Sequence, residues 1–498
     1  MNTLKACHSL TILNLMKYIL MLLPFLVFGQ GAPDYELAFR DYEKYREPSL
    51  EHRRFKHEDL EPLIRELKKD PFFTVKRLGR SVQGRDIYLI SVGEGATDVL
   101  LWSQMHGDEP TATMSLFDLF NYFKENREVL TNLRLHAIPM LNPDGAEVYA
   151  RRNAIGVDIN RDAVKLQSPE ARILKRVRDS LQADFGFNLH DQSIHYNTGK
   201  SNLPASISFL APAFDEKISV NEVRGRAMQV IAVMNQALQN YIPGQVGRYS
   251  DAFEARAFGD NMQKWGTSTI LIESGGFAGD PEKQNLRKMN FVGILAGIHS
   301  IGTGSYRNVP EKEYARIPGN DRKLFDLKIE NLTFPYLGRE YTVDLGITWE
   351  EVENQDHSDF YYRGKIKDIG DLSGYFGYES LDAAGLQFQT GETYPRILNN
   401  YDELAELELT ELLKKGYTSV SISDLPEEIK FIEQPMNIVD ITNIRIPKSN
   451  AMPQPPVSFS RNPTFLLLQQ DEVVYAVING FIYDLRHGEN RVKNGLVE

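Results

Sequence analysis

Apolar residues in the first three hundred positions alternate between two kinds of pattern. Short continuous apolar runs, which are typical of buried strands, occur at residues 87–92, 99–103, 133–140, 185–189 and 267–272. Between these runs, apolar residues recur at spacings of three and four and predict helices that begin near Leu60, Pro110, Pro169 and Pro281. Strands that alternate with helices predict an α/β fold with a mixed, mostly parallel sheet flanked by helices.

The pattern changes after Tyr306. The later apolar runs are short and strand-like, as at 341–347, 360–366 and within 464–484, with one helix around 404–413. We therefore divide the chain into four parts: an N-terminal segment at 1–29 that is predicted to be a signal peptide, a charged arm or lead-in helix at 30–57, a sheet domain at 58–305 and a β-rich accessory region at 306–498. The Pro-rich stretch at 447–456 marks a place where the accessory region could be two modules.

The N-terminal segment has the features of a secretory signal peptide. Lys5 and Lys17 precede an apolar run at 18–28 that is short for a membrane span, and Gly29 follows at the expected cleavage position. This pattern predicts a secreted or periplasmic protein, with an uncleaved N-terminal anchor as the alternative. Cys7 is the only cysteine of the chain and lies in this segment, so the mature protein would depend on its core rather than on disulfides.

The charge of the chain limits its partners. The formal net charge is −12, which argues against nucleic acid or an anionic membrane as a partner. No second long apolar stretch follows the N-terminal one, so we expect no stable membrane insertion once the signal is removed.

Four residues that can bind a metal or a proton lie at or just after the ends of predicted strands. His106 and Glu109 occupy a strand-to-helix turn, His190 ends the run at 185–189, and Glu273 ends the run at 267–272. In open α/β sheets, ligands bind at the carboxyl ends of the strands. A single His-x-x-Glu could be an acidic surface turn, but the shared position of these groups indicates a metal site.

The motifs MHGDEP, NPDG, RRNAIGVDINRD, NLHDQ and TILIESGG occur in this order, after GRSVQGRDI. Over residues 60–302 the chain thereby resembles the zinc metallocarboxypeptidase family of the carboxypeptidase A type. The resemblance implies a carboxypeptidase-like fold for the sheet domain and one Zn²⁺ per chain. It also implies a hydrolase that acts on peptides with a free C-terminal carboxylate.

Carried over to matching positions, the resemblance assigns five residues to the metal and the reaction. His106, Glu109 and His190 would be the zinc ligands, a His₂Glu set known from catalytic zinc sites. Asp158 would orient the first histidine ligand. Glu273 would be the general base that takes a proton from water and then gives it to the leaving amine.

The resemblance also assigns substrate contacts. Arg151 would stabilise the oxyanion, although a shift of one residue would exchange it with Arg152. Asn160 and Arg161 would hold the terminal carboxylate, and Tyr249 would cap the substrate. Without the resemblance, the arginines would be read as solvated charges and Tyr249 as a surface aromatic.

Two other functions remain open on the sequence. The same zinc site could serve an amidase that acts on N-acyl amino acids or on murein stem peptides, because an exported protein meets cell-wall peptides. Alternatively, the catalytic domain could be inactive and the chain a binding module.

Overall fold

A computed structural model of the chain describes residues 34–440, 454–488, 490–491 and 493–497. The predicted signal segment and most of the Pro-rich stretch lie outside these residues. The described part contains no helix that is both long enough and apolar enough to cross a bilayer.

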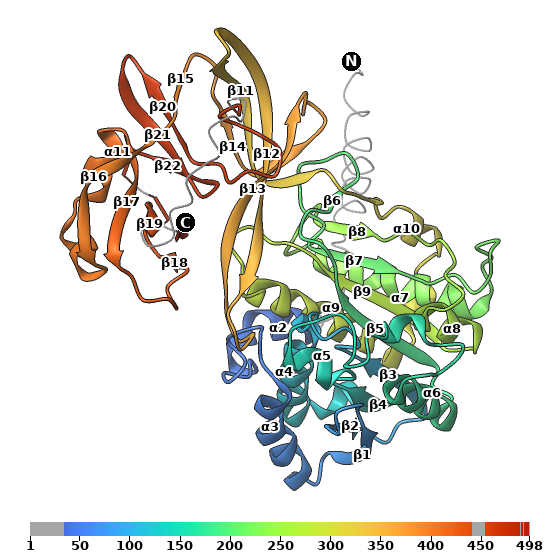
Figure 1. Cartoon of the computed structure of the whole chain (residues 1–498). Helices are drawn as coiled ribbons and strands as arrows, with labels where there is room; N and C mark the ends of the chain where they lie inside the picture. Colours follow the sequence, from blue (N-terminus) through green and yellow to red (C-terminus); the bar gives the residue numbers. More distant parts are fainter. Residues whose placement is uncertain (1–33, 441–453, 489, 492, 498) are drawn as a thin grey trace, which may run out of the picture.

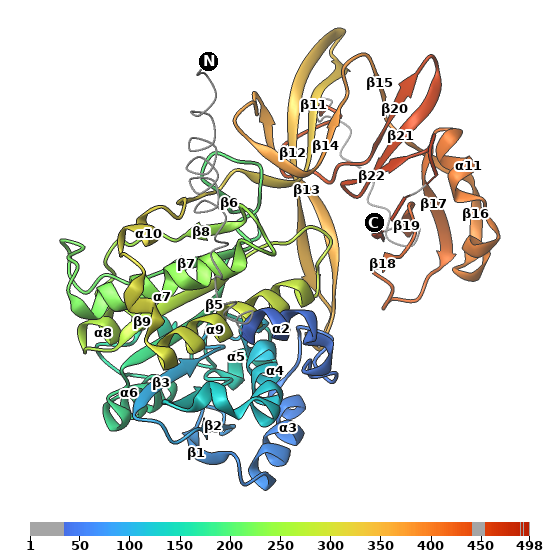
Figure 2. The same cartoon turned by 180° about the vertical axis from the view of Figure 1, so that it is seen from behind.

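Residues 74–274 contribute eight strands to one sheet (Figures 1 and 2). Its strands, in spatial order, are β1 (Thr74–Arg80), β2 (Asp86–Val92), β4 (Leu133–Ile138), β3 (Thr97–Trp102), β5 (Phe185–Asp191), β9 (Ser268–Ser274), β7 (Ile207–Leu210) and β8 (Val246–Arg248). The central strands β4, β3, β5 and β9 are parallel, whereas β1, β2 and β7 pair antiparallel with their neighbours on the central side. The predicted mixed sheet with a parallel centre is therefore confirmed.

Helices cover both faces of the sheet because the central strands are apolar on both sides. Val99 and Leu101 of β3 pack with the larger core, and Leu100 and Trp102 pack with the smaller one. The larger core includes residues of α4 (Thr111–Glu125), α7 (Glu222–Leu238) and α9 (Gln284–Thr303), and the smaller core includes residues of α6 (Pro169–Leu181) and α8 (Phe258–Lys264). Such two-sided burial explains the continuous apolar runs.

Short elements complete the domain. They are α2 (Asp34–Arg40), η1 (Tyr42–Lys44), α3 (His57–Lys69), η2 (Arg127–Leu130), α5 (Pro143–Glu147), η3 (Ile159–Arg161), β6 (Asn197–Thr198), η4 (Ser305–Asn308), α10 (Lys312–Ala315) and β10 (Asn320–Asp321).

The N-terminal arm packs against the sheet domain through a buried ion pair. Arg287 of α9 and Asp118 of α4 both have fully buried side chains, and Arg287 Nε donates to Asp118 Oδ2 over 2.8 Å. Arg287 also donates to the carbonyls of Leu50 and Glu47, and Tyr42 donates its hydroxyl proton to Asp118 over 2.7 Å. The pair thus satisfies polar groups of the arm that burial would otherwise leave without partners.

We expect Arg287→Met to destabilise the protein by about 3–5 kcal/mol, because it leaves the buried Asp118 carboxylate without its cation. The free energy of unfolding, measured by urea denaturation, checks this value. Arg316→Met is the control, since the Arg316 side chain is 69% exposed, and should change stability by less than about 0.5 kcal/mol. A loss for Arg287→Met no larger than that of the control would contradict the assigned role.

In the described part of the chain beyond β10, the strands form four further sheets. They contain β13 (Phe360–Gly370), β12 (Arg339–Glu353), β11 (Leu324–Tyr336) and β14 (Phe376–Asp382); β15 (Gln387–Gln389), β20 (Phe465–Gln469), β21 (Glu472–Ile478) and β22 (Phe481–Asp484); β16 (Glu392–Asn400), β17 (Tyr417–Asp424) and β19 (Asn437–Asp440); and β18 (Phe431–Ile432) with β23 (Gly495–Leu496). The predicted helix at 404–413 is two short helices, η5 (Asp402–Glu406) and α11 (Leu409–Lys414).

Strands from both sides of 447–456 share sheets. Strand β15 pairs with β20, and β18 pairs with β23. The structure therefore does not divide the accessory region into two modules at this stretch. Local patterns could not indicate this arrangement, because strand pairing depends on partners that are distant in the sequence.

The accessory region contacts the sheet domain on the side of the long β12 and β13 strands (Figures 1 and 2). Arg54 Nη2 lies 2.8 Å from Glu351 Oε2, and Arg53 pairs with the same carboxylate. His195 Nε2 lies 3.0 Å from Asp326 Oδ2 on β11. The sheet domain and the accessory region are thus joined by side-chain contacts as well as by the chain itself.

Candidate metal centre

The turn between β3 and α4 positions the first two candidate ligands. His106 and Glu109 follow the end of β3, and His106 Nδ1 lies 2.8 Å from Glu109 Oε1. The turn packs against α5, which contains the NPDG motif: a Cβ atom on Gly107 would lie 2.0 Å from the carbonyl carbon of Gly145. Only glycine at position 107 allows these two segments to approach so closely.

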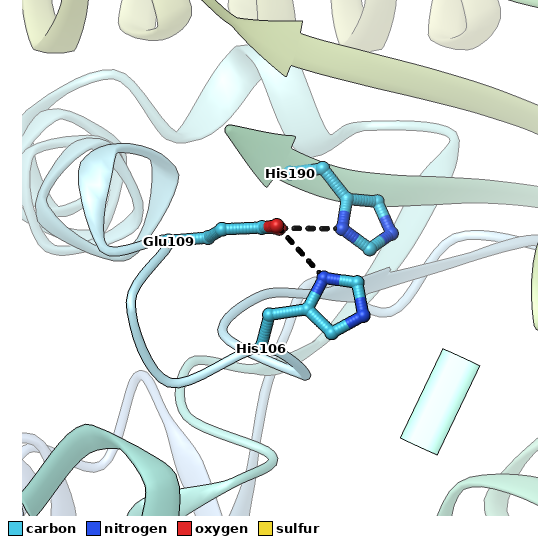
Figure 3. Close-up of side chains that lie close together, drawn as sticks. All are labelled: His106, Glu109 and His190. Carbon is cyan, nitrogen blue, oxygen red and sulfur yellow. Dashed lines mark hydrogen bonds and ion pairs between the residues drawn. The ribbon is translucent and has the colours of Figure 1, made fainter. Parts of the chain in front are cut away.

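The third candidate ligand comes from the neighbouring strand. His190 lies next to the end of β5, and its Nδ1 atom is 2.6 Å from Glu109 Oε2. Figure 3 shows the Glu109 carboxylate facing both imidazole rings. All three side chains are buried, and one ligand atom from each lies within 4.8 Å of the others. The structure therefore brings together the three residues that the sequence suggested.

The ligand atoms of this group are of the kinds that bind a divalent metal ion. Two imidazole nitrogens and one carboxylate form a known donor set for catalytic zinc. Burial raises the pKa of the Glu109 carboxyl, but the two histidines lower it by more, so the pKa lies below its usual value. An ionised carboxylate between two Nδ1 atoms is the form that can bind a cation.

Asp158 and Arg151 surround His106. Asp158 Oδ1 lies 3.1 Å from His106 Nε2, the ring nitrogen that does not face Glu109. Arg151 Nη1 lies 3.3 Å from Glu109 Oε1, and its Nε donates to Asp158 Oδ2 over 3.1 Å. Arg152 instead donates to the carbonyl of Gly156 and is exposed. Of the two candidate arginines, the structure thus places Arg151 beside the cluster.

Glu273 lies on β9 directly beside the third ligand, because His190 and Glu273 are register partners on parallel strands. Its side chain is partly exposed, and within the described residues its carboxylate accepts no hydrogen bond. Burial, Glu109 and Asp191 raise the pKa of Glu273 well above its usual value. A carboxylate with a raised pKa is suited to accept and release a proton near neutral pH.

The candidate substrate residues lie in different environments. Asn160 is buried, and its Oδ1 accepts a hydrogen bond from the Phe258 amide over 3.0 Å. The Arg161 side chain is 35% exposed, and its Nε atom lies 3.4 Å from Glu254 Oε2. Asn160 thus positions α8, while Arg161 is accessible but already has an anionic neighbour.

Tyr249 lies on the Glu273 side of the cluster. Burial and the charge of Glu273 raise the pKa of Tyr249, and its ring contacts that of Tyr196 edge to face, with centroids 5.9 Å apart. Its half-buried position differs from that of an isolated surface aromatic.

Sequence reasoning missed one polar connection at the site. Asp191 Oδ2 accepts hydrogen bonds from Lys283 Nζ over 3.0 Å and from Thr111 Oγ1 over 2.6 Å. The Asp191 amide donates to Glu109 Oε2 over 3.3 Å. Asp191 could have been suspected, because it directly follows His190, but no local pattern distinguishes Lys283 from other lysines.

Comparison with known proteins agrees with this site. Residues 60–204 match the family model described as zinc carboxypeptidase. The match includes the three candidate ligands and ends before Glu273. The cofactor that names the family is zinc, and the His-Glu-His group is of the type that binds it.

Individual relatives match over short segments. Carboxypeptidase SOL1 of Arabidopsis thaliana is 30% identical over 132 residues, which are 23% of this chain and 27% of that protein. The human carboxypeptidase N catalytic chain is 31% identical over 140 residues, 22% of this chain and 31% of its own length. The chain thus spans about a third or less of these relatives.

Among solved structures, a metallo-carboxypeptidase from Pseudomonas aeruginosa is similar with a TM-score of 0.41 and 19% identity. The similarity covers 51% of this chain and 70% of that one.

Proposed function

We propose that the chain is a zinc carboxypeptidase that hydrolyses the C-terminal peptide bond of peptides. The observation that carries this proposal is the buried cluster of His106, Glu109 and His190 beside a Glu273 carboxylate that has no hydrogen-bond partner among the described residues. A purely structural cluster would not need a partly exposed carboxylate with a raised pKa beside it.

His106, Glu109 and His190 would hold the zinc. When bound, zinc polarises a carbonyl oxygen and lowers the pKa of water. Glu273 would accept the proton of the attacking water and then deliver it to the leaving amine, which its raised pKa allows. Arg151, at 42% side-chain exposure, can reach the oxygen on which negative charge develops.

Arg161 would select substrates with a free terminal carboxylate. A guanidinium can bind a carboxylate through two parallel hydrogen bonds. In the structure Arg161 pairs with Glu254, which also pairs with Arg256. The substrate carboxylate would replace Glu254, and Arg256 would retain that side chain.

Peptides with free and amidated C-termini test this function. The wild-type protein should remove single residues from the free peptide, with little loss from the amidated one, and a zinc chelator should stop the reaction. Arg161→Ala should raise KM for the free peptide about 10-fold or more, since it removes one charged hydrogen-bonding group. Mass spectrometry of the products measures both effects.

The control is Arg152→Ala, because Arg152 is exposed and donates only to a backbone carbonyl among the described residues. It should behave like the wild type. Equal cleavage of free and amidated peptides would contradict the role of Arg161. Cleavage limited to peptides with D-amino acids would retain the proposed metal site but identify cell-wall stem peptides as the substrate. Cleavage limited to N-acyl amino acids would likewise retain the site and identify acylated amino acids as the substrate.

We also propose that the protein is exported. The proposal is supported by the charged and apolar pattern of residues 1–29, which lie outside the described residues. The N-terminus of the protein recovered from the medium or periplasm would begin near residue 30. An intact N-terminal segment would favour an uncleaved anchor.

A further inference from the structure

A cavity of about 590 Å³ lies between the sheet domain and the accessory region. The sheet domain contributes Ile194 and the segment from Gly275 to Lys283, which begins two residues after Glu273. The accessory region contributes residues of β11, β12, β13 and β14 and the chain near Arg491. The volume lies within the range of about 300–1,000 Å³ that is usual for ligand sites.

The cavity adjoins the proposed reaction centre. Lys283 lines it and donates to Asp191 over 3.0 Å, and the Asp191 amide donates to Glu109 over 3.3 Å. The positive charge of Lys283 also lowers the pKa of Glu273, against the larger effects that raise it. One wall of the cavity is therefore connected directly to the residues around the metal site.

The residues proposed to bind the terminal carboxylate of the substrate lie outside this cavity. The cavity lining does not include Asn160, Arg161 or their partners Phe258 and Glu254. The charge of Arg161 nevertheless lowers the pKa of Asp158, which lies beside His106. The charge of Arg161 thus reaches the cluster through Asp158, whereas the cavity is connected to the cluster through Lys283 and Asp191.

The charges in the cavity indicate which residues fit there. Within the described residues, the four lining carboxylates all have partners. Asp326 and Glu351 take part in the contacts between the domains, Glu379 pairs with Lys493, and Asp280 accepts hydrogen bonds from backbone amides at the start of α9. Arg491 is exposed and forms no ion pair with a described residue. Trp349 adds an aromatic surface, with Lys493 Nζ 3.6 Å from its ring centroid. Among the lining cations of the described residues, Arg491 is therefore the one that has no carboxylate partner, because Arg53, Lys283 and Lys493 are each in an ion pair.

We propose that this cavity binds the upstream residues of a peptide substrate, and that Arg491 selects an acidic residue there. The inference rests on the proposed carboxypeptidase function. The accessory region would then be part of the substrate site, and the enzyme would prefer oligopeptides over dipeptides.

The test compares three substrates: an N-blocked dipeptide and two hexapeptides with the same C-terminal half, carrying Glu or Lys in the upstream half. The wild type should cleave the Glu hexapeptide with a kcat/KM at least about 5-fold above that of the Lys hexapeptide, the scale of one partly exposed ion pair. Arg491→Glu should reverse this preference and leave the dipeptide unchanged. Arg491→Ala should abolish the preference without creating the opposite one.

Arg339→Glu is the matched control, because Arg339 is exposed at the start of β12 and does not line the cavity. It should retain the wild-type preference. Equal rates for both hexapeptides in the wild type, or equal losses on the dipeptide and the hexapeptides in Arg491→Glu, would overturn the proposal.

Calorimetry separates this inference from the proposed function. If the wild type cleaves none of the three substrates, the function fails, and the cavity is judged by binding of the two hexapeptides to the zinc-loaded protein. Tighter binding of the Glu hexapeptide, lost in Arg491→Glu, would support the cavity as a peptide site. Equal binding of the two would overturn it.

Discussion

Glu273→Gln should bind zinc as the wild type does and lose about 10²–10⁴-fold in kcat, the usual contribution of a general base. The amide preserves the size of the side chain but cannot accept the proton from water. Because Glu273 is not one of the three clustered ligands, metal content should stay the same. Metal analysis and peptide hydrolysis on one preparation measure the two effects together.

Glu222→Gln provides the control for Glu273→Gln. The Glu222 side chain is 87% exposed at the first turn of α7, so the same chemical change there should leave kcat unaltered. Turnover by Glu273→Gln within a factor of about 10 of the wild type would remove Glu273 from the proton transfer.

His190→Ala should lose stoichiometric zinc and all measurable hydrolysis. Loss of a residue that only supports a ligand costs about 10–100-fold in metal affinity, and loss of a ligand should cost more. The change also leaves Glu109 with one imidazole partner instead of two. Zinc should raise the melting temperature of the wild type and have a smaller effect on the variant.

His487→Ala is the matched histidine control, since the side chain of His487 is 74% exposed in the accessory region. It should retain zinc and activity. Stoichiometric zinc in His190→Ala would exclude His190 as a ligand. Loss of zinc from both variants would indicate a general effect of the preparation rather than of the site.

The residues that the structure groups around the metal site could be predicted because they follow a topological rule. His106 follows β3, while His190 and Glu273 lie one residue before the ends of β5 and β9, and these three strands are adjacent and parallel. Local patterns fix the strands, and the parallel arrangement brings their ends together. The geometry of the site then follows from positions of strand ends that are visible in the sequence.

The other contacts join residues whose pairing has no local signal. The attachment of the arm depends on Arg287 and Asp118, which are 169 positions apart. Glu254 beside Arg161 and Lys283 beside Asp191 are likewise products of tertiary packing. Charged residues of this kind are numerous in the chain, and only the folded structure shows which of them meet.

The interleaving of the accessory sheets also constrains the order in which the chain can fold. Strand β15 has its sheet partner β20 more than seventy positions later, and β18 is paired by β23 near residue 495. Closing such long loops carries an entropic cost that is repaid only when both partners are present. During synthesis, the sheet domain can fold first, whereas the sheets that contain β20 and β23 cannot form until residues 465–496 have been made. If the cavity binds substrate as proposed, the enzyme would acquire its preference for long peptides only at this last step.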